Sequence, residues 1–287
     1  MSNGPDSKLG TIITAMVTPF SDDGSVDLDS TRTLLNHLVA NGSDGVVVAG
    51  TTGEAPTLTD DEQIELIAFV ASEFGDQLTV IAGAGANDTA HAVRLTERAT
   101  EAGAVAILSS VPYYNRPNEA GLLLHYAAIA ESTDLPVVLY NVPTRTGLDM
   151  SDELAAELGA RHENIVGMKQ ARPGDPKPIP GLDLYAGNDD SFAAALDVGG
   201  VGGILVASHL LGTEMRQVAE ASDRAAADRH YRAFYDALGV TTNPIPIKAA
   251  LDIAGLPGGE LRLPLVKATD SERETIEAAM REVGLLT

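Results

Sequence analysis

A lysine that follows a short apolar run is the residue in this sequence best suited to covalent chemistry. Lys169 comes directly after Ile165–Met168, a β-branched run typical of a buried strand. A lysine that loses its hydration has a lowered pKa, and its neutral amine can attack a carbonyl group to form a Schiff base. The chain otherwise avoids this residue type, with only five lysines: Lys8, Lys169, Lys177, Lys248 and Lys267. We therefore favour a nucleophile at Lys169 over a solvated surface charge.

The segment Thr51-Thr52-Gly53-Glu54 follows another apolar run, Gly45–Ala49. Its hydroxyls and amides could bind an anion such as a carboxylate, and Gly53 would allow close approach of the backbone. The alternative is that the two threonines only cap the loop through hydrogen bonds to its backbone. Alone, this segment is a weak indication of an anion site.

Tyrosines also follow apolar runs. Tyr113 and Tyr114 lie side by side in a chain in which aromatic residues make up 4%. Such a pair can form a packing or subunit contact, or its hydroxyls can carry protons near a Schiff base. Tyr140 ends the run Val137–Tyr140, and its hydroxyl could point toward Lys169.

Arg145 lies between Pro143 and Gly147, in the segment that follows Tyr140. Its planar guanidinium group matches the geometry of a carboxylate. An isolated arginine is more often a surface charge, but one held in a short loop after a strand is a candidate for substrate binding.

Glycines near the last two apolar runs could let backbone groups approach a small ligand, or could serve only as turn residues. Gly187 precedes Asn188-Asp189-Asp190, and Gly202-Gly203 precedes Ile204. Gly83-Ala84-Gly85 lacks the third glycine and the acidic residue of a dinucleotide site, so we expect no nucleotide there.

The elements that would position these residues alternate along the chain. Short apolar runs typical of strands buried on both faces are separated by amphipathic segments such as Ser30–Ala40, Asp60–Phe74 and Thr89–Ala102, each preceded or opened by an N-cap type of residue. Eight such runs predict a (β/α)8 TIM barrel, in which catalytic residues come from the carboxyl ends of the strands. A doubly wound sheet would need a GxGxxG turn after its first strand, and none is present. The runs are Thr11–Val17, Gly45–Ala49, Thr79–Ala82, Ala104–Leu108, Val137–Tyr140, Ile165–Met168, Leu184–Ala186 and Gly203–Val206.

Three regions follow from this pattern: a flexible N-terminal tail (1–10), the catalytic barrel (11–221) and a helical C-terminal extension (222–287). Beyond about residue 221 the strand pattern stops. Asp223–Leu238, Pro246–Ile253 and Ser271–Val283 predict about three further helices, separated by segments rich in glycine and proline.

Composition excludes several classes of site and partner. With no cysteine, the chain has no disulfide, no cysteine-ligated metal and no cysteine nucleophile, and its six histidines show no ligand spacing, so we expect no metal site. A net charge of −22 disfavours nucleic acid and anionic membranes as partners. Neither a signal-peptide pattern at the start nor an apolar run of the roughly 18–20 residues needed to span a bilayer occurs, so we expect a cytoplasmic protein.

The excess of acidic residues, 41 against 19 basic ones, is typical of proteins adapted to concentrated salt, although an ordinary acidic protein is the alternative. If the surface is halophilic, the temperature of thermal unfolding should rise from low to molar KCl, because salt screens the repulsion between carboxylates. A melting series in KCl tests this, and a flat or falling series would contradict it.

Together, the segments AMVTPF, GTTGE, PYYNRP, YNVPTRTG, VGMK, AGNDD, NPIPIKAAL and GELRLPL, in this order, span nearly the whole chain. In this respect the sequence resembles the dihydrodipicolinate synthase/N-acetylneuraminate lyase family. The resemblance implies a class I aldolase mechanism in which a lysine forms an imine with pyruvate, with no metal or organic cofactor. It further implies condensation with L-aspartate 4-semialdehyde to 4-hydroxy-tetrahydrodipicolinate, in lysine and diaminopimelate biosynthesis.

The resemblance also implies a role for each matching residue. Lys169 would form the imine, Tyr140 would be the general acid and base, and Thr51 would link it to Tyr114 of a neighbouring subunit, which implies a homotetramer built as a dimer of dimers. The pyruvate carboxylate and the semialdehyde would be bound by the remaining candidates, Thr52, Gly53, Ile204, Arg145, Asn115 and Gly187.

Two departures from the family pattern bear on specificity. The segment Gln170–Asp175 has one residue more than is common after the lysine, which keeps another pyruvate-dependent aldolase, such as 2-keto-3-deoxygluconate aldolase, as the alternative. Asp60, Gln63 and His91 stand where lysine-inhibited members carry other residues, so we expect weak or absent feedback inhibition by L-lysine. TTGE, Tyr114 and Arg145 favour the synthase over the sialate-cleaving branch.

Overall fold

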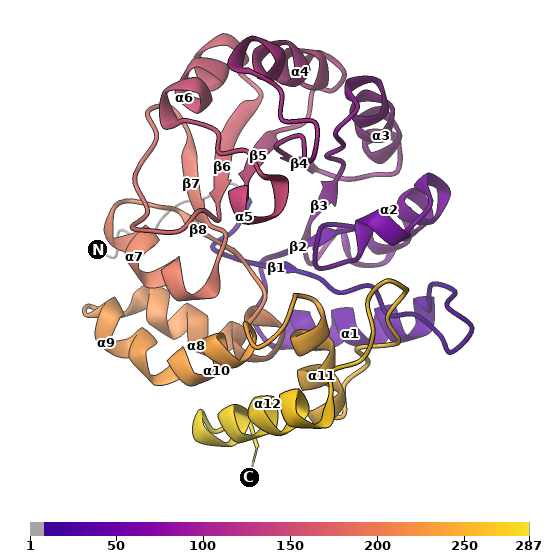
Figure 1. The fold of residues 1–287 in the computed structure, drawn as a ribbon, viewed down its shortest axis with the longest axis vertical. Helices are drawn as coiled ribbons and strands as arrows, with labels where there is room; N and C mark the ends of the chain where they lie inside the picture. Colours follow the sequence, from indigo (N-terminus) through magenta and orange to yellow (C-terminus); the bar gives the residue numbers. More distant parts are fainter. Residues whose placement is uncertain (1–8, 287) are drawn as a thin grey trace.

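Eight parallel strands form a closed barrel in the computed structural model, which describes residues 9–286 (Figure 1). Each strand pairs with the next, and β1 also pairs with β8, so the sheet has no free edge. The predicted (β/α)8 barrel is confirmed. The strands are β1 (Ile12–Ala15), β2 (Gly45–Val48), β3 (Thr79–Gly83), β4 (Ala106–Ser110), β5 (Val137–Asn141), β6 (Ile165–Gln170), β7 (Asp183–Ala186) and β8 (Gly202–Leu205).

The helices between the strands begin where the sequence carries N-cap residues. Asp27, Thr59 and Asp88 each accept a hydrogen bond from a backbone N–H of the following first turn. The helices of the barrel are α1 (Leu28–Ala40), α2 (Asp60–Phe74), α3 (Thr89–Glu101), α4 (Glu119–Glu131), α5 (Pro143–Thr146), α6 (Asp152–Arg161), α7 (Phe192–Asp197) and α8 (Ser208–Glu220), with short 3-10 turns η1 (Ala55–Thr57) and η2 (Asp189–Ser191).

Two apolar clusters make up the core, because successive side chains of a strand point to opposite faces of the sheet. Val138 and Tyr140 of β5 point into the barrel, whereas Val137 and Leu139 pack outward against the helices. This alternation directs Tyr140 to the barrel interior, at the carboxyl end of its strand.

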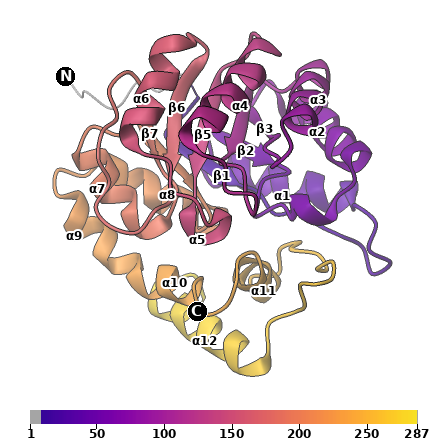
Figure 2. The ribbon, with the colours of Figure 1, turned by 45° about the horizontal axis from the view of Figure 1, so that its top comes forward.

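The C-terminal extension is helical, as predicted, and groups α10 (Arg232–Ala237), α11 (Ile245–Ile253) and α12 (Asp270–Glu282) beside the barrel (Figure 2). The prediction of one helix over Asp223–Leu238 is wrong: α9 (Arg224–Asp228) and α10 (Arg232–Ala237) are separated by the 3-10 turn η3 (Arg229–Tyr231). At this break the buried Asp228 accepts a hydrogen bond from Tyr235 and pairs with Arg232.

The predicted N-terminal tail, residues 1–10, falls almost entirely outside the described residues. Leu9 is described; it is only 6% exposed and packs with the cluster inside the barrel. The proposed boundaries between tail, barrel and extension stay predictions. No helix within residues 9–286 combines the length and the apolar character needed to cross a membrane.

Candidate active site

Lys169 and Tyr140 lie side by side because of the register between two strands. Tyr140 of β5 pairs with Lys169 of β6, and neighbours in register on parallel strands point to the same face. The Lys169 Nζ atom lies 4.2 Å from the centroid of the Tyr140 ring. Lys169 was predicted to follow the strand directly, but it lies within it, since β6 continues through Gln170.

Burial controls the charge of Lys169, whose side chain is 5% exposed. Loss of hydration lowers the pKa of Lys169 to about 7; the Asp189 carboxylate acts against this, and the positive charge of Arg145 adds to it. A substantial fraction of neutral amine is therefore present near pH 7, which a lysine nucleophile requires.

Tyr140 lies in the same dry environment. Burial raises the pKa of the Tyr140 hydroxyl, while Arg145 and a hydrogen bond with the Thr51 side chain oppose the increase. At neutral pH the phenol is therefore protonated, and it can donate a proton to an atom bound at Lys169.

Thr51 and Thr52 are held at the end of β2 by contacts from distant segments. The Asn243 side-chain amide donates to Thr52 Oγ1 at 2.9 Å, and the Thr18 hydroxyl donates to the carbonyl oxygen of Gly53 at 2.7 Å. A Cβ atom at Gly53 would lie 3.2 Å from the Met16 carbonyl oxygen, so this position favours a glycine for packing as well as for any ligand approach.

These residues surround a pocket of about 390 Å³ at the carboxyl ends of the strands. A pocket of this size suits a small metabolite. Six residues that were predicted from the sequence line it together: Lys169, Tyr140, Thr51, Thr52, Arg145 and Gly187.

Arg145 comes from the short helix α5 and is exposed at the rim of this pocket. Its guanidinium group donates to the Asn243 carbonyl oxygen at 3.1 Å. That one contact leaves other N–H groups of the fork for a ligand, because a guanidinium has five.

Four predicted residues do not line this pocket in the single chain. Tyr114 is 90% exposed with a left-handed φ of 70°, and the Asn115 side chain instead donates to the Asn87 carbonyl oxygen at 2.7 Å. Ile204 is buried inside the barrel, and Gly53 is also buried. A contribution of Tyr114 from a neighbouring subunit stays a prediction.

Two residues of the site were missed by the sequence reasoning. Asp189 follows β7 and lines the pocket; burial raises its pKa to about 6, and its Oδ1 accepts hydrogen bonds from the N–H groups of Val206 and Ala207, both at 2.9 Å. Asn243 belongs to the extension, and only its place in the NPIPIKAAL segment could have indicated it. Within residues 9–286, no group of three or more histidine or acidic side chains is arranged to hold a metal ion.

Comparisons with known proteins identify the family. Residues 8–283 match the model of the dihydrodipicolinate synthetase family. A 4-hydroxy-tetrahydrodipicolinate synthase of Moorella thermoacetica is 44% identical, covering 96% of this chain and 99% of the relative, and that of Bacillus subtilis is 39% identical, covering 96% and 99%.

Solved structures give the same result. The crystal structure of DHDPS from Cyanidioschyzon merolae with lysine bound matches with a TM-score of 0.93 and 39% identity, covering 97% of this chain and 99% of that one. Dihydrodipicolinate synthase from Thermotoga maritima matches with a TM-score of 0.93 and 37% identity, covering 98% and 100%. This chain therefore belongs to the dihydrodipicolinate synthetase family.

Proposed function

We propose that this chain is a 4-hydroxy-tetrahydrodipicolinate synthase, a lyase of lysine and diaminopimelate biosynthesis that condenses pyruvate with L-aspartate 4-semialdehyde. The observation that carries the proposal is a buried lysine with a pKa of about 7 beside a buried tyrosine, in a pocket of metabolite size. The names of the relatives support this activity. They do not favour the alternative, 2-keto-3-deoxygluconate aldolase.

The reaction begins when the neutral amine of Lys169 attacks the keto carbon of pyruvate. Loss of water gives an imine, and loss of a methyl proton gives an enamine that attacks the aldehyde carbon of the semialdehyde. The semialdehyde amine then displaces Lys169, which closes the ring and frees the lysine. Because the imine withdraws electrons, we propose that the reaction needs no metal or organic cofactor.

Tyr140 and Thr51 carry the protons in this scheme, with Tyr114 of a second subunit completing the relay. Tyr140 protonates the oxygen that leaves as water, and its hydrogen bond with Thr51 gives the proton a path. The exposed position of Tyr114 in the single chain supports its supply to a neighbour, and hence a homotetramer with at least a functional dimer.

Different residues bind the carboxylates of the two substrates. Thr52, the backbone of Gly53 and that of Ile204 hold pyruvate, and Arg145 holds the carboxylate of the semialdehyde through its planar fork. Gly187 also lines this pocket, and Asn115 stays a sequence-based candidate for substrate binding. We further propose that the enzyme works in the cytoplasm.

A direct assay tests the activity: pyruvate and aspartate semialdehyde should be consumed together, with formation of the cyclic product. Cleavage of 2-keto-3-deoxygluconate under the same conditions, with no reaction of the semialdehyde, would favour the alternative.

The pH dependence of imine formation should report Lys169. Its neutral form is the nucleophile, so the initial rate of adduct formation with pyruvate should rise through about pH 7 and then level off. Since the Asp189 carboxylate raises the pKa of Lys169, Asp189→Asn should move this midpoint to lower pH. Trapping with cyanoborohydride across a pH series measures it. A midpoint that stays fixed or rises in Asp189→Asn would contradict the assignment.

L-Lysine should inhibit weakly or not at all. A second cavity of about 390 Å³ shares Thr51, Tyr140 and Arg145 with the active-site pocket, and is also lined by the segments that carry Asp60, Gln63 and His91. His91 Nε2 lies 2.9 Å from Asp60 Oδ1, so the imidazole is engaged within the chain. Initial rates with added lysine provide the measurement, and inhibition at sub-millimolar concentrations would overturn this expectation.

A further inference from the structure

Two residues of the sequence motifs quoted above have no part in the proposed chemistry, yet they form a buried ion pair. Glu54 ends the TTGE segment, and Lys248 belongs to α11 of the extension. Their Oε1 and Nζ atoms lie 2.6 Å apart, and the two side chains are 0% and 3% exposed. Charges buried to this degree need each other, because an unpaired one would be strongly unfavourable.

The pair closes a ring of contacts around the turn that carries Thr51 and Thr52. Lys248 Nζ donates to the Thr18 carbonyl oxygen at 2.8 Å, and the Thr18 hydroxyl donates to the carbonyl oxygen of Gly53 at 2.7 Å. Gly53 is bonded to Glu54, whose carboxylate returns to Lys248. The turn is thereby fixed both to the segment after β1 and to α11.

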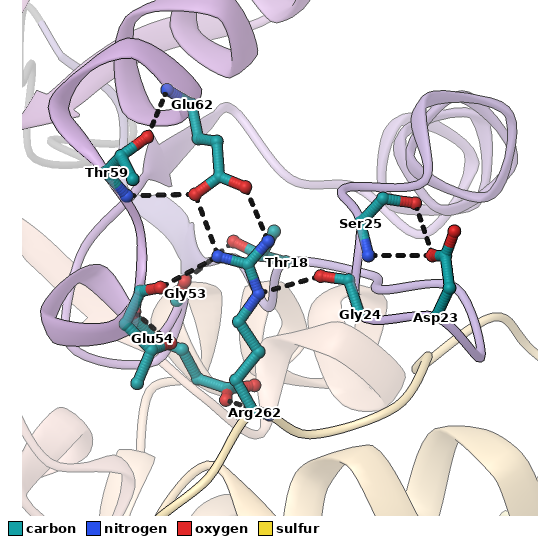
Figure 3. A network of polar contacts seen from close by, with 10 residues as sticks. Thr18, Asp23, Gly24, Ser25, Gly53, Glu54, Thr59, Glu62 and Arg262 are labelled. Carbon is teal, nitrogen blue, oxygen red and sulfur yellow. Dashed lines mark hydrogen bonds and ion pairs between the residues drawn. The ribbon is translucent and has the colours of Figure 1, made fainter.

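A second group from the extension holds the same carboxylate. The backbone N–H of Arg262 donates to Glu54 Oε2 at 3.1 Å. The Arg262 side chain donates to Glu62 and to the carbonyl oxygens of Gly24 and Thr57, as Figure 3 shows for Glu62 and Gly24. Arg262 therefore connects the turn to the start of α2.

The backbone of Glu54 needs this support. Its φ of 58° is left-handed, a conformation that is uncommon and unfavourable for a residue with a side chain. Glu54 lies three positions after Thr51, which hydrogen-bonds Tyr140. It lies two positions after Thr52, which lines the pocket. A shift of the turn would therefore move both hydroxyls.

We propose that the Glu54–Lys248 ion pair positions the groups that bind pyruvate. It fixes the turn to the extension, so that Thr51 keeps its hydrogen bond with Tyr140 and Thr52 keeps lining the pocket. The inference rests on the proposed function. Lys248 acts as a structural ammonium group with backbone and carboxylate acceptors, in contrast to Lys169, and it should not form an adduct with pyruvate.

Glu54→Gln is the sharpest test, because it keeps the shape and one acceptor for Arg262 while turning an amide toward the Lys248 ammonium. We expect the KM for pyruvate to rise and kcat to fall, each by about tenfold or more, as small misplacements of binding groups produce. The KM for the semialdehyde should change by less than about threefold, because Arg145 lies outside the ring of contacts. Lys248→Met should likewise raise the KM for pyruvate and leave the KM for the semialdehyde within about threefold.

Lys267→Met is the matched control. Lys267 lies on the same extension and pairs with Glu260 at 2.5 Å, but it is 70% exposed, and such pairs contribute little. Its kinetic constants should equal those of the wild type. Circular dichroism and thermal melting of each variant separate folding from positioning.

Every outcome decides between the alternatives. Folded Glu54→Gln with a raised KM for pyruvate and an unchanged KM for the semialdehyde supports positioning. Wild-type kinetics with only a lower melting temperature overturns it, and so does failure of both variants to fold, which would make the pair a stability element. A wild-type protein that traps no pyruvate would instead refute the proposed function, before any variant is compared.

Discussion

Replacing Lys169 by alanine should abolish both turnover and the pyruvyl adduct. Among the lysines of residues 9–286, only Lys169 lines the pocket. It lies in register with Tyr140 inside the barrel, and burial lowers its pKa to about 7. A methyl group cannot form the imine on which each later step depends. We expect a loss of about 10³-fold or more in kcat, as when other covalent catalysts are removed.

Lys177→Ala is the matched control for this variant. Lys177 lies eight positions further along the chain and is exposed, so its removal should leave kcat and the adduct unchanged. Substantial turnover by a folded Lys169→Ala protein would exclude the imine mechanism at this residue.

Tyr140→Phe should lower kcat by about 10²- to 10⁴-fold, the range for loss of a positioned acid or base. The ring that lies 4.2 Å from Lys169 Nζ is retained, so the pocket should keep its shape and the KM for pyruvate should change little. Only the hydroxyl, which hydrogen-bonds Thr51 and is kept protonated by burial, is lost. Steady-state kinetics and the rate of adduct trapping measure the effect.

Tyr126→Phe provides the comparison. Tyr126 is also buried and loses a hydroxyl, but it lies on α4 and does not line the pocket. Equal kcat values in the two variants would show that the Tyr140 hydroxyl carries no proton in a slow step.

The sequence was sufficient to predict the residues that sit at strand ends. Short apolar runs are typical of barrel strands, and the polar residue after each run falls at the carboxyl end, where the pocket lies. This is why Lys169, Tyr140, Thr51 and Thr52 could be grouped without coordinates. The end of β6 was placed two residues early in the prediction, because Lys169 and Gln170 are polar. In the fold both are buried, and Gln170 Oε1 accepts a hydrogen bond from Asn141.

Contacts between distant segments could not be predicted in this way. Asn243 reaches Thr52 across 191 positions, and Lys248 reaches the Thr18 carbonyl across 230. Neither the hydrophobic pattern of the sequence nor the helix and strand propensities of its residues specify where the extension packs on the barrel. Asp189 is local to a predicted strand end, but its influence on the pKa of Lys169 depends on burial, which only the fold reveals.

Reduction with borohydride in the presence of pyruvate, followed by mass spectrometry of the intact chain and its peptides, tests the central claim most directly. We expect one reduced pyruvyl group per chain, on the peptide that contains Lys169 and not on the one that contains Lys248, at high and at low salt. Adding aspartate semialdehyde should diminish the adduct by drawing the enamine into product. No adduct under any of these conditions, or one carried by Lys248, would contradict the account.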